Sequence, residues 1–172
     1  MPLIVSGIVL VGDNLSITYT NTLAAEMPIP ADQNMQELVT NYLNAGTKQG
    51  IIDKYGIIDD WNTSKVTNMN AMFYEASAFN QDISGWDVSK VTNMNAMFYN
   101  ASAFNPDISG WDVGNVKNMR SMFNKASAFN QNISEWDVRN VIDAYFFGAD
   151  SPLCTDASVN PPNFNYNTNI CP

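Results

Sequence analysis

The sequence contains no histidine, which removes the commonest general base and metal ligand from the chain. It also lacks a phosphate-binding loop, a dinucleotide-binding glycine motif and a cysteine-based metal motif. Aspartates are numerous, but most of them recur because a sequence unit recurs, whereas a catalytic pair of carboxylates needs two unlike environments. We therefore expect a protein that is not an enzyme and that uses no cofactor and no metal ion.

Basic residues are scarce too, with 8 Lys and Arg against 17 Asp and Glu and a formal net charge of −9. The phosphates of nucleic acids and anionic membranes repel such a chain. Its apolar run at residues 3–11 is too short to span a bilayer, and no Lys or Arg precedes it as in a secretory signal. We expect protein partners or cell-surface glycans, no nucleic acid, no membrane insertion, and neither a signal peptide nor a transmembrane segment in this sequence.

What the sequence does contain is a repeat. Trp61, Trp86, Trp111 and Trp136 each restart the same unit of 25 residues, and the fourth copy breaks down after Val141. A unit of this length cannot bury its own apolar face and gains stability by stacking on copies of itself. The repeat therefore predicts a solenoid, in which identical residues form rows with a spacing of about 4.8 Å.

Within one unit, Ile83, Trp86, Val88 and Val91 follow a spacing close to that of leucine-rich repeats. The stretch ISGWDV, rich in β-branched and aromatic residues, predicts a short strand that pairs in parallel with its copies. The next stretch, NMNAMFYNASAF, has Met, Phe and Ala at spacings of three and four and predicts a short helix. We expect an α/β repeat, that is, a short leucine-rich-repeat solenoid with a parallel strand and a short helix in each unit.

The repeat also predicts rows of phenylalanine and asparagine. We expect the phenylalanines to fill the interior and the asparagines to hydrogen-bond the backbone of the turns. The rows are Phe73, Phe98 and Phe123; Phe79, Phe104 and Phe129; Asn68, Asn93 and Asn118; and Asn80, Asn105 and Asn130.

The unit WDVSxVxNMxxMFxxASAFNxDIS resembles the repeats of BspA-like leucine-rich-repeat surface proteins, and the resemblance covers Lys54 to Val141. It implies a short, right-handed, non-catalytic solenoid used for adhesion or partner binding, of a kind found in bacterial, protist and viral proteins. It names no ligand and supplies no catalytic residue. The fourth unit departs from the motif, because Asp143, Ala144, Tyr145 and Phe146 replace its NMxxM, and this puts a full fourth coil in doubt.

Four segments are expected along the chain. Residues 1–30 contain two β-rich runs around a turn and predict a β-hairpin, which either adds to the scaffold or anchors the chain to a partner. Residues 31–57 carry an amphipathic pattern and predict a helical cap on the open end of the core. Residues 58–143 form the predicted solenoid, and residues 144–172, with an Asn- and Pro-rich tail, predict a loop-rich C-terminal cap.

The two cysteines, Cys154 and Cys171, bracket the C-terminal tail. Two interpretations are open. A disulfide would close the tail, stabilise the fold by about 3 kcal/mol and suit an oxidising exterior. Alternatively, the residues are two reduced thiols, because sequence alone does not give the distance between them.

One row of polar residues is a candidate binding surface. If residues of the expected strand alternate, Asp87, Asp112 and Asp137 point outward together, with Asn62 at the start of the row and Glu135 beside its end. Like charges on neighbouring strands are destabilising, so the row either is tolerated by exposure to water or binds a cation, sugar hydroxyls or a basic patch. No recognised calcium-loop spacing is present, so no metal site is predicted.

These expectations lead to two hypotheses. In the first, the chain is a non-enzymatic protein-interaction module, a structural or decorating subunit of a larger assembly such as a virion capsid or tail, attached through residues 1–30. In the second, it is a cell-surface adhesin or a ligand-binding repeat domain. Both hypotheses place the protein outside the cell or on a virion surface.

Overall fold

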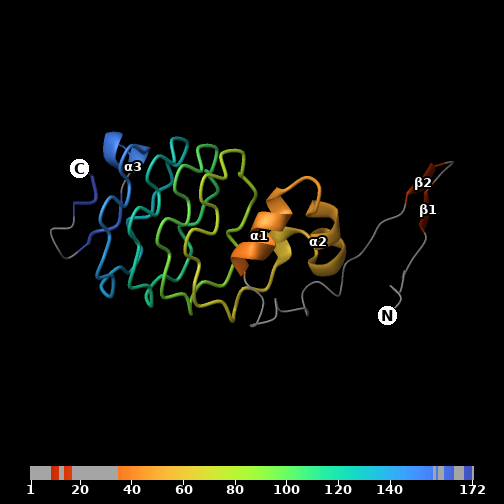
Figure 1. Ribbon diagram of the computed structural model, residues 1–172, viewed down its shortest axis with the longest axis horizontal. Coiled ribbons are helices and arrows are strands. Elements are labelled where there is room, and N and C mark those ends of the chain that lie inside the picture. Colours follow the sequence, from red (N-terminus) through yellow and green to blue (C-terminus); the bar gives the residue numbers. More distant parts are fainter. Residues whose placement is uncertain are drawn as a thin grey trace.

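A stack of similar coils, with helices before and after it, makes up the body of the computed structural model (Figure 1). The structure describes residues 9–11, 14–16, 35–156, 158, 161–164 and 169–171. Near the N-terminus, strands β1 (Val9–Val11) and β2 (Asn14–Ser16) pair antiparallel. The rest of the predicted hairpin segment 1–30 lies outside the described residues.

Two helices precede the coils. Helix α1 (Met35–Leu43) buries Met35, Leu38, Val39 and Tyr42, which lie at helical spacing on one face. Helix α2 (Lys48–Tyr55) follows, and the short 3-10 helix η2 (Ile58–Asp60) leads into the first coil. The ring of Tyr42 packs edge-on against Trp61, with centroids 5.5 Å apart. Helix α1 therefore seals the first end of the core.

The coils contain neither the predicted strand nor the predicted helix. From residue 61 to residue 151, all of which the structure describes, the chain forms turns joined by isolated parallel bridges. The bridges link Asn68 to Asn93, Asn93 to Asn118, and Asn118 to Asp143. The predicted leucine-rich-repeat solenoid, with a parallel strand and a short helix in each unit, is therefore wrong.

Short polar side chains explain why ISGWDV does not form a strand. On both sides of Trp86, Oδ1 of Asp82, Asp87 and Asn93 accepts the backbone N–H of the residue two positions later, at 2.9–3.0 Å. A hydrogen bond of this kind holds the backbone in a local turn and removes its N–H from any strand pairing. Between these turns, the N–H of Trp86 donates to the carbonyl of Ile83 at 3.1 Å, which closes another turn.

Pairing between coils runs instead along the stretch that was predicted to be helical. In each coil we call this stretch the ladder segment: residues 69–75, 94–100, 119–125 and 144–150. In the second coil, alternate N–H groups, those of Met94, Ala96, Phe98 and Asn100, donate to carbonyls of the third coil at 2.8–2.9 Å. Because these N–H groups point to the next coil, they are not available to a helix.

The ladder segment alternates in backbone conformation. Ala96 and Asn100 have φ angles of 51° and 54°, and the equivalent residues of the other coils are also left-handed. Residues between them close tight turns, such as the hydrogen bond from the N–H of Met97 to the carbonyl of Met94 at 3.2 Å. Left-handed residues other than glycine cost about 1 kcal/mol or more each, so the hydrogen bonds between coils must offset this cost.

The two phenylalanine rows are buried, as predicted from the repeat. The ring of Phe98 stacks on Phe73 and Phe123, with centroids 5.4 and 5.5 Å away, and on Phe104 of the second row at 3.9 Å. Tryptophan links successive coils, because Nε1 of Trp111 donates to the carbonyl of Ile83 at 3.3 Å. The core is thus continuous along the stack.

The asparagine rows hydrogen-bond the backbone, which confirms that prediction. Oδ1 of Asn93 accepts the N–H of Asn95 within its own coil at 3.0 Å. Oδ1 of Asn80 accepts the N–H of Asn105 in the next coil at 2.9 Å. One row therefore closes turns, and the other ties neighbouring coils together.

The fourth coil pairs fully along its ladder segment, even though its sequence departs from the repeat. The N–H of Lys125 donates to the carbonyl of Ala149 at 2.8 Å, so the pairing continues beyond residue 143. Gly148 stands in the row of Phe73, Phe98 and Phe123. A Cβ at Gly148 would lie 2.9 Å from Cβ of Leu153, so glycine leaves room for helix α3 (Pro152–Thr155).

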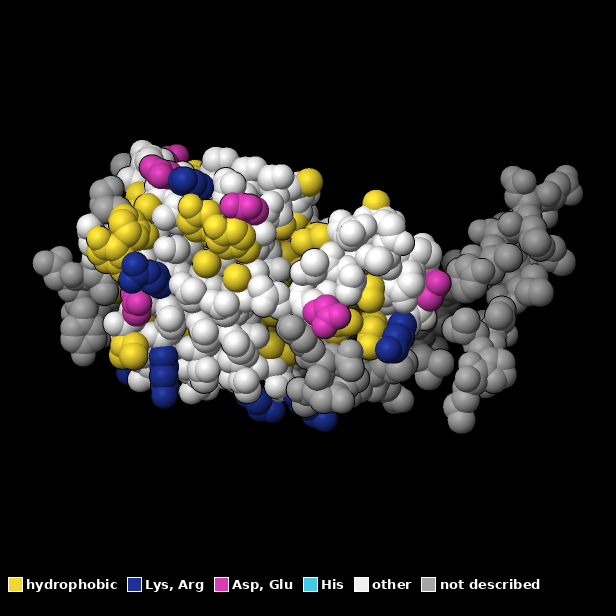
Figure 2. Space-filling model, viewed as in Figure 1, with side chains coloured by type: hydrophobic (Ala, Val, Ile, Leu, Met, Phe, Trp, Pro, Cys, Tyr) yellow, Lys and Arg dark blue, Asp and Glu magenta, His cyan; other side chains and the backbone are white. Residues whose placement is uncertain are grey.

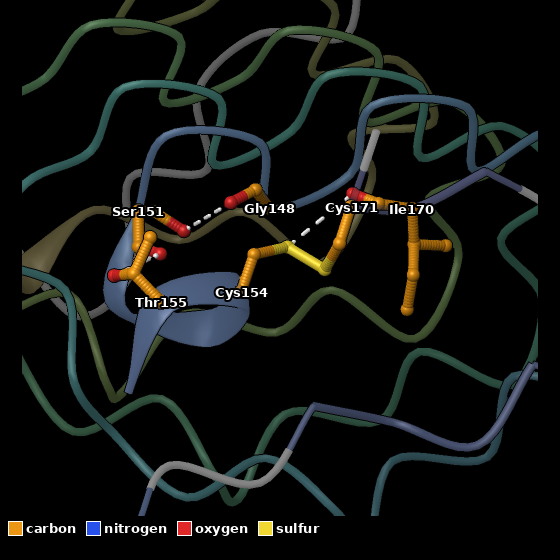
Figure 3. The surroundings of a disulfide bond; sticks show 6 residues. All are labelled: Gly148, Ser151, Cys154, Thr155, Ile170 and Cys171. Atoms are coloured by element: carbon orange, nitrogen blue, oxygen red, sulfur yellow. Dashed lines mark hydrogen bonds between the residues drawn. A yellow bond between two sulfur atoms is a disulfide. The ribbon is translucent and has the colours of Figure 1, made fainter. Parts of the chain in front are cut away.

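A disulfide joins Cys154 to Cys171, which settles the question that the sequence left open (Figure 3). It holds the tail against the last coil. There the carbonyls of Asn169 and Ile170 accept the N–H groups of Phe146 and Gly148, at 2.9 and 3.2 Å. The tail thereby continues the hydrogen bonding of the ladder past the fourth coil.

Candidate functional site

The predicted polar row lies on the surface of the stack. Asp87, Asp112 and Asp137 are exposed and Asn62 is half-buried. A Cβ built on Gly114 would lie 3.2 Å from Oδ1 of Asp112 and 3.9 Å from Oδ2 of Asp137, so these two carboxylates face the same turn.

Every member of the row closes a turn. Oδ1 of Asn62, Asp87, Asp112 and Asp137 accepts the backbone N–H of the residue two positions later, at 3.0–3.2 Å. Glu135 lies beside the row, and Oε1 of its carboxylate accepts a hydrogen bond from Oγ of Ser134 at 3.4 Å. These contacts account for the residue types without a ligand, and a binding role for the row stays a prediction.

Hydrogen bonds favour the ionised form of two carboxylates of the row, those of Asp87 and Asp137. The side chain and the backbone N–H of Ser89 hold the pKa of Asp87 below its usual value. Arg139 binds Asp137 through two nitrogens, at 2.8 and 2.7 Å, and this lowers the pKa of Asp137 to about 2. The carboxylate at the end of the row is therefore already paired with a cation of its own chain.

The ion pair between Asp137 and Arg139 predicts how the stability of the fold changes at acidic pH. Because the pKa of Asp137 falls from 3.8 to about 2 on folding, its contribution to stability is complete above pH 3.8 and is lost as the pH falls toward 2. The pKa values of Asp82, Asp87 and Asp107 are lowered as well, so they act in the same direction. We expect the urea midpoint to fall steadily over this pH window.

Two measurements check this expectation. Replacing Arg139 with glutamine should raise the pKa of Asp137 in an NMR titration, because the side-chain hydrogen bonds of Arg139 are the largest cause of the shift. The variant Lys90→Gln is the control, because Lys90 is an exposed cation of another turn and should leave the pKa of Asp137 unchanged. A urea midpoint that is constant between pH 4 and pH 2 would contradict the role of these turns.

A second acidic row borders a shallow depression of about 310 Å³, lined by Asn80, Asp82, Ser84, Asn105, Pro106 and Asp107. Its two carboxylates have equivalent environments. Hydrogen bonds from Ser84 lower the pKa of Asp82, and hydrogen bonds from Ser109 lower the pKa of Asp107. General acid catalysis needs a carboxyl group that keeps its proton. Two carboxylates that both favour the ionised form do not provide it.

The described part of the chain offers no cluster of three or more His, Cys, Asp or Glu residues that could hold a metal ion. None of its helices is long and apolar enough to cross a membrane. Disulfides persist in oxidising environments, so the bond between Cys154 and Cys171 is consistent with an extracellular location.

The sequence interpretation missed a second surface, which we call the ladder face: the exposed and half-buried side chains of the ladder segments. Hydrophobic and charged side chains gather there over the coils (Figure 2). The rings of Tyr74 and Tyr99 stack with centroids 4.8 Å apart, and Nζ of Lys125 lies 5.8 Å from the centroid of Tyr99. The guanidinium of Arg120 lies 5.0 Å from the centroid of Tyr145.

A signal for this surface is present in the repeat. Residues 64–74 and 89–99 are identical, whereas the third and fourth units differ from them at positions on the ladder face. The buried residues of the third ladder segment, Met119, Met122 and Phe123, keep the identity that they have in the first two units. Exposed residues that depart from the repeat therefore indicate a role other than the stacking of the coils.

Comparison with known proteins identifies a family for most of the chain. A family model described as "Mycoplasma protein of unknown function, DUF285" matches residues 33–156, a range that includes α1, all four coils and α3. Neither the curated proteins nor the solved structures contain a match.

Proposed function

The chain belongs to the DUF285 family of Mycoplasma proteins of unknown function, and from this premise we propose that it is a non-enzymatic protein-interaction module. The family description assigns no activity, so the proposal rests on the stack. Each coil places its exposed side chains beside those of the next, which produces one continuous face along the array (Figure 2). Stacked repeats of this kind provide extended binding surfaces.

The finer form of the proposal is that the chain is a structural or decorating subunit of a larger assembly. Residues 1–30 attach it. Strands β1 and β2 support this view, because a two-stranded pair is marginal in water by itself and exposes edge N–H and C=O groups that can pair with the sheet of a partner. The disulfide supports a place outside the cell or on a virion surface.

Deleting residues 1–30 should separate attachment from folding. We expect the shortened chain, residues 31–172, to keep a cooperative thermal transition, because α1, the phenylalanine rows and the tail disulfide all lie outside the deletion. In density-gradient sedimentation with particles or envelopes from the source cells, the full chain should co-sediment and the shortened chain should remain at the top. The matched control carries a Gly- and Ser-rich segment of equal length in place of residues 1–30.

Two outcomes would contradict the anchor role. If the shortened chain lacks a thermal transition, residues 1–30 are part of the scaffold. If it co-sediments as the full chain does, another surface makes the attachment.

A cell-surface adhesin or ligand-binding repeat domain is the second candidate. The stacked rings of Tyr74, which is exposed, and Tyr99, which is half-buried, favour it, as does the resemblance of the repeat to BspA-like surface proteins. Aromatic side chains with one polar end are frequent at binding interfaces. Under this alternative, residues 31–172 alone should bind cell surfaces, and Tyr74→Ala together with Tyr99→Ala should abolish the binding.

A further inference from the structure

The last two coils present an unusual group of side chains in and just before their ladder segments. Lys117, Arg120, Ile142 and Tyr145 are exposed, and Phe146 is half-buried. We call this group the basic-aromatic corner. Ile142 is 78% exposed and Tyr145 is 36% exposed. The N–H of Ile142 donates to the carbonyl of Lys117 at 2.8 Å, which places these two residues side by side on neighbouring coils. Figure 2 shows basic side chains next to hydrophobic ones on the face of the stack that it presents.

The ring contacts join the other members of the corner. The guanidinium of Arg120 lies over the ring of Tyr145, 5.0 Å from its centroid. The rings of Tyr145 and Phe146 meet edge to face, with centroids 4.1 Å apart. A flat cation and two aromatic rings are therefore in contact with one another, and the pair Lys117 and Ile142 precedes Arg120 and Tyr145 in the sequence of the same two coils.

Stacking of the coils does not require these side chains. The equivalent positions in the first two units are Thr67 and Thr92, Asn70 and Asn95, and Ala71 and Ala96, and those coils pair in the same way. An isoleucine that is mostly exposed contributes little to the core, whereas exposed apolar groups rimmed by polar ones mark interaction sites. The corner therefore fits a contact with another molecule better than a contribution to folding.

We propose that the basic-aromatic corner binds an extended acidic segment of a partner protein. Carboxylates of the partner would pair with Lys117 and Arg120, and an apolar side chain would pack on Ile142 and Tyr145. The corner concentrates two cations on a chain whose formal net charge is −9, so it complements a negative partner. Ile142 favours a peptide over an anionic glycan, because an aliphatic side chain gains nothing from sugar hydroxyls. The inference rests on the proposed function of the chain as an interaction module.

Asp143 limits the charge of this surface. Its Oδ2 lies 3.7 Å from Nη1 of Arg120, and both side chains are partly exposed. A guanidinium has five N–H donors, so this contact leaves Arg120 able to bind a second carboxylate. Asp143 stands in the row of Asn68, Asn93 and Asn118, and its Oδ1 accepts the N–H of Tyr145 as those asparagines accept theirs. Asp143→Asn therefore removes the competing charge and keeps the turn.

The test is fluorescence anisotropy with the full chain and a short labelled peptide of alternating glutamate and leucine. We expect binding that weakens with added salt. Arg120→Ala and Ile142→Ser should each weaken it about tenfold, and Asp143→Asn should strengthen it about threefold. Lys90→Ala, which removes an exposed lysine from another turn, is the matched control and should leave the affinity unchanged. A thermal melt of each variant verifies that the fold is retained.

Several results would overturn the proposal. They are no binding of the acidic peptide, equal binding of a peptide of alternating lysine and leucine, and equal affinity for the wild type and the two weakening variants. Binding of oligogalacturonate in preference to the peptide would show a glycan surface instead and would also overturn it. Sedimentation of the Arg120→Ala chain with its parent assembly distinguishes the proposed binding role of the corner from the proposed function as an interaction module. If this variant co-sediments but does not bind the peptide, the chain still acts as an interaction module, but the corner is not the surface that attaches it.

Discussion

Replacing Phe98 with alanine should lower the free energy of unfolding by about 3–5 kcal/mol. Phe98 is fully buried in the second coil, and its ring contacts the first coil, the third coil and the second phenylalanine row. Truncation at this position opens a cavity that neighbouring coils cannot close, because their ladder segments are fixed to each other by backbone hydrogen bonds. A urea titration followed by tryptophan fluorescence measures the loss.

Tyr74→Ala provides the matched control for Phe98→Ala. Tyr74 is also an aromatic residue of a ladder segment with a stacked neighbour, but it is 48% exposed. Its truncation should cost less than about 1 kcal/mol, since little buried surface is lost. Equal costs for the two variants would show that the stack is not held by its phenylalanine core. A transition of Phe98→Ala in two steps would show that the coils unfold separately.

The repeat predicted which side chains are buried better than it predicted the backbone. Met94, Met97, Phe98 and Ala101 lie at spacings of three and four, which is the pattern of a helix face, and all four are fully buried. Consecutive tight turns of alternating hand produce the same inward spacing as a helix does. The spacing therefore gave the correct inward residues but the wrong secondary structure.

The missing information concerns the left-handed residues. Ala96 has a φ angle of 51°, although alanine is a strong helix former and rarely adopts this conformation. Its conformation is imposed by the next coil, whose Arg120 carbonyl accepts its N–H at 2.8 Å. A contact between residues of different coils overrides the local conformational propensity of alanine here. The sequence of one repeat unit gives local propensities only, so it could not predict this conformation.

For the candidate sites too, the sequence predicted which residues are exposed but not the contacts that they make. The spacing of the acidic row placed Asp87, Asp112 and Asp137 outward, and they are exposed. Their hydrogen bonds within the turns depend on a fold that the sequence interpretation did not contain. The ladder face was missed because its stretch was assigned to a helix wall. Comparing units position by position would have identified Arg120 and Tyr145 as departures from Asn70 and Asn95.

Removing the disulfide should destabilise the last coil more than any other. The bond between Cys154 and Cys171 closes a loop with a sequence separation of 17, for which the chain-entropy model gives a stabilisation of about 3 kcal/mol. The double variant Cys154→Ser and Cys171→Ser avoids an unpaired thiol. We expect its urea midpoint to fall and to become insensitive to dithiothreitol, whereas reduction of the wild type should bring its midpoint to that of the variant.

Amide hydrogen exchange would show which residues lose stability when the disulfide is removed. The tail supplies the carbonyls for Phe146 and Gly148, and Phe164 packs edge-on against Phe147 with ring centroids 5.1 Å apart. Without the covalent bond, these weak contacts alone must hold the tail, so Phe146 and Gly148 should exchange much faster. Met94 and Phe98 donate to the third coil, which the tail does not touch through any backbone hydrogen bond of the described residues. Their exchange should therefore change only as much as global stability does.

Equal acceleration at all four amides would mean that the tail stabilises the stack as a whole. Unchanged exchange at Phe146 and Gly148 would mean that the disulfide does not hold the tail in place.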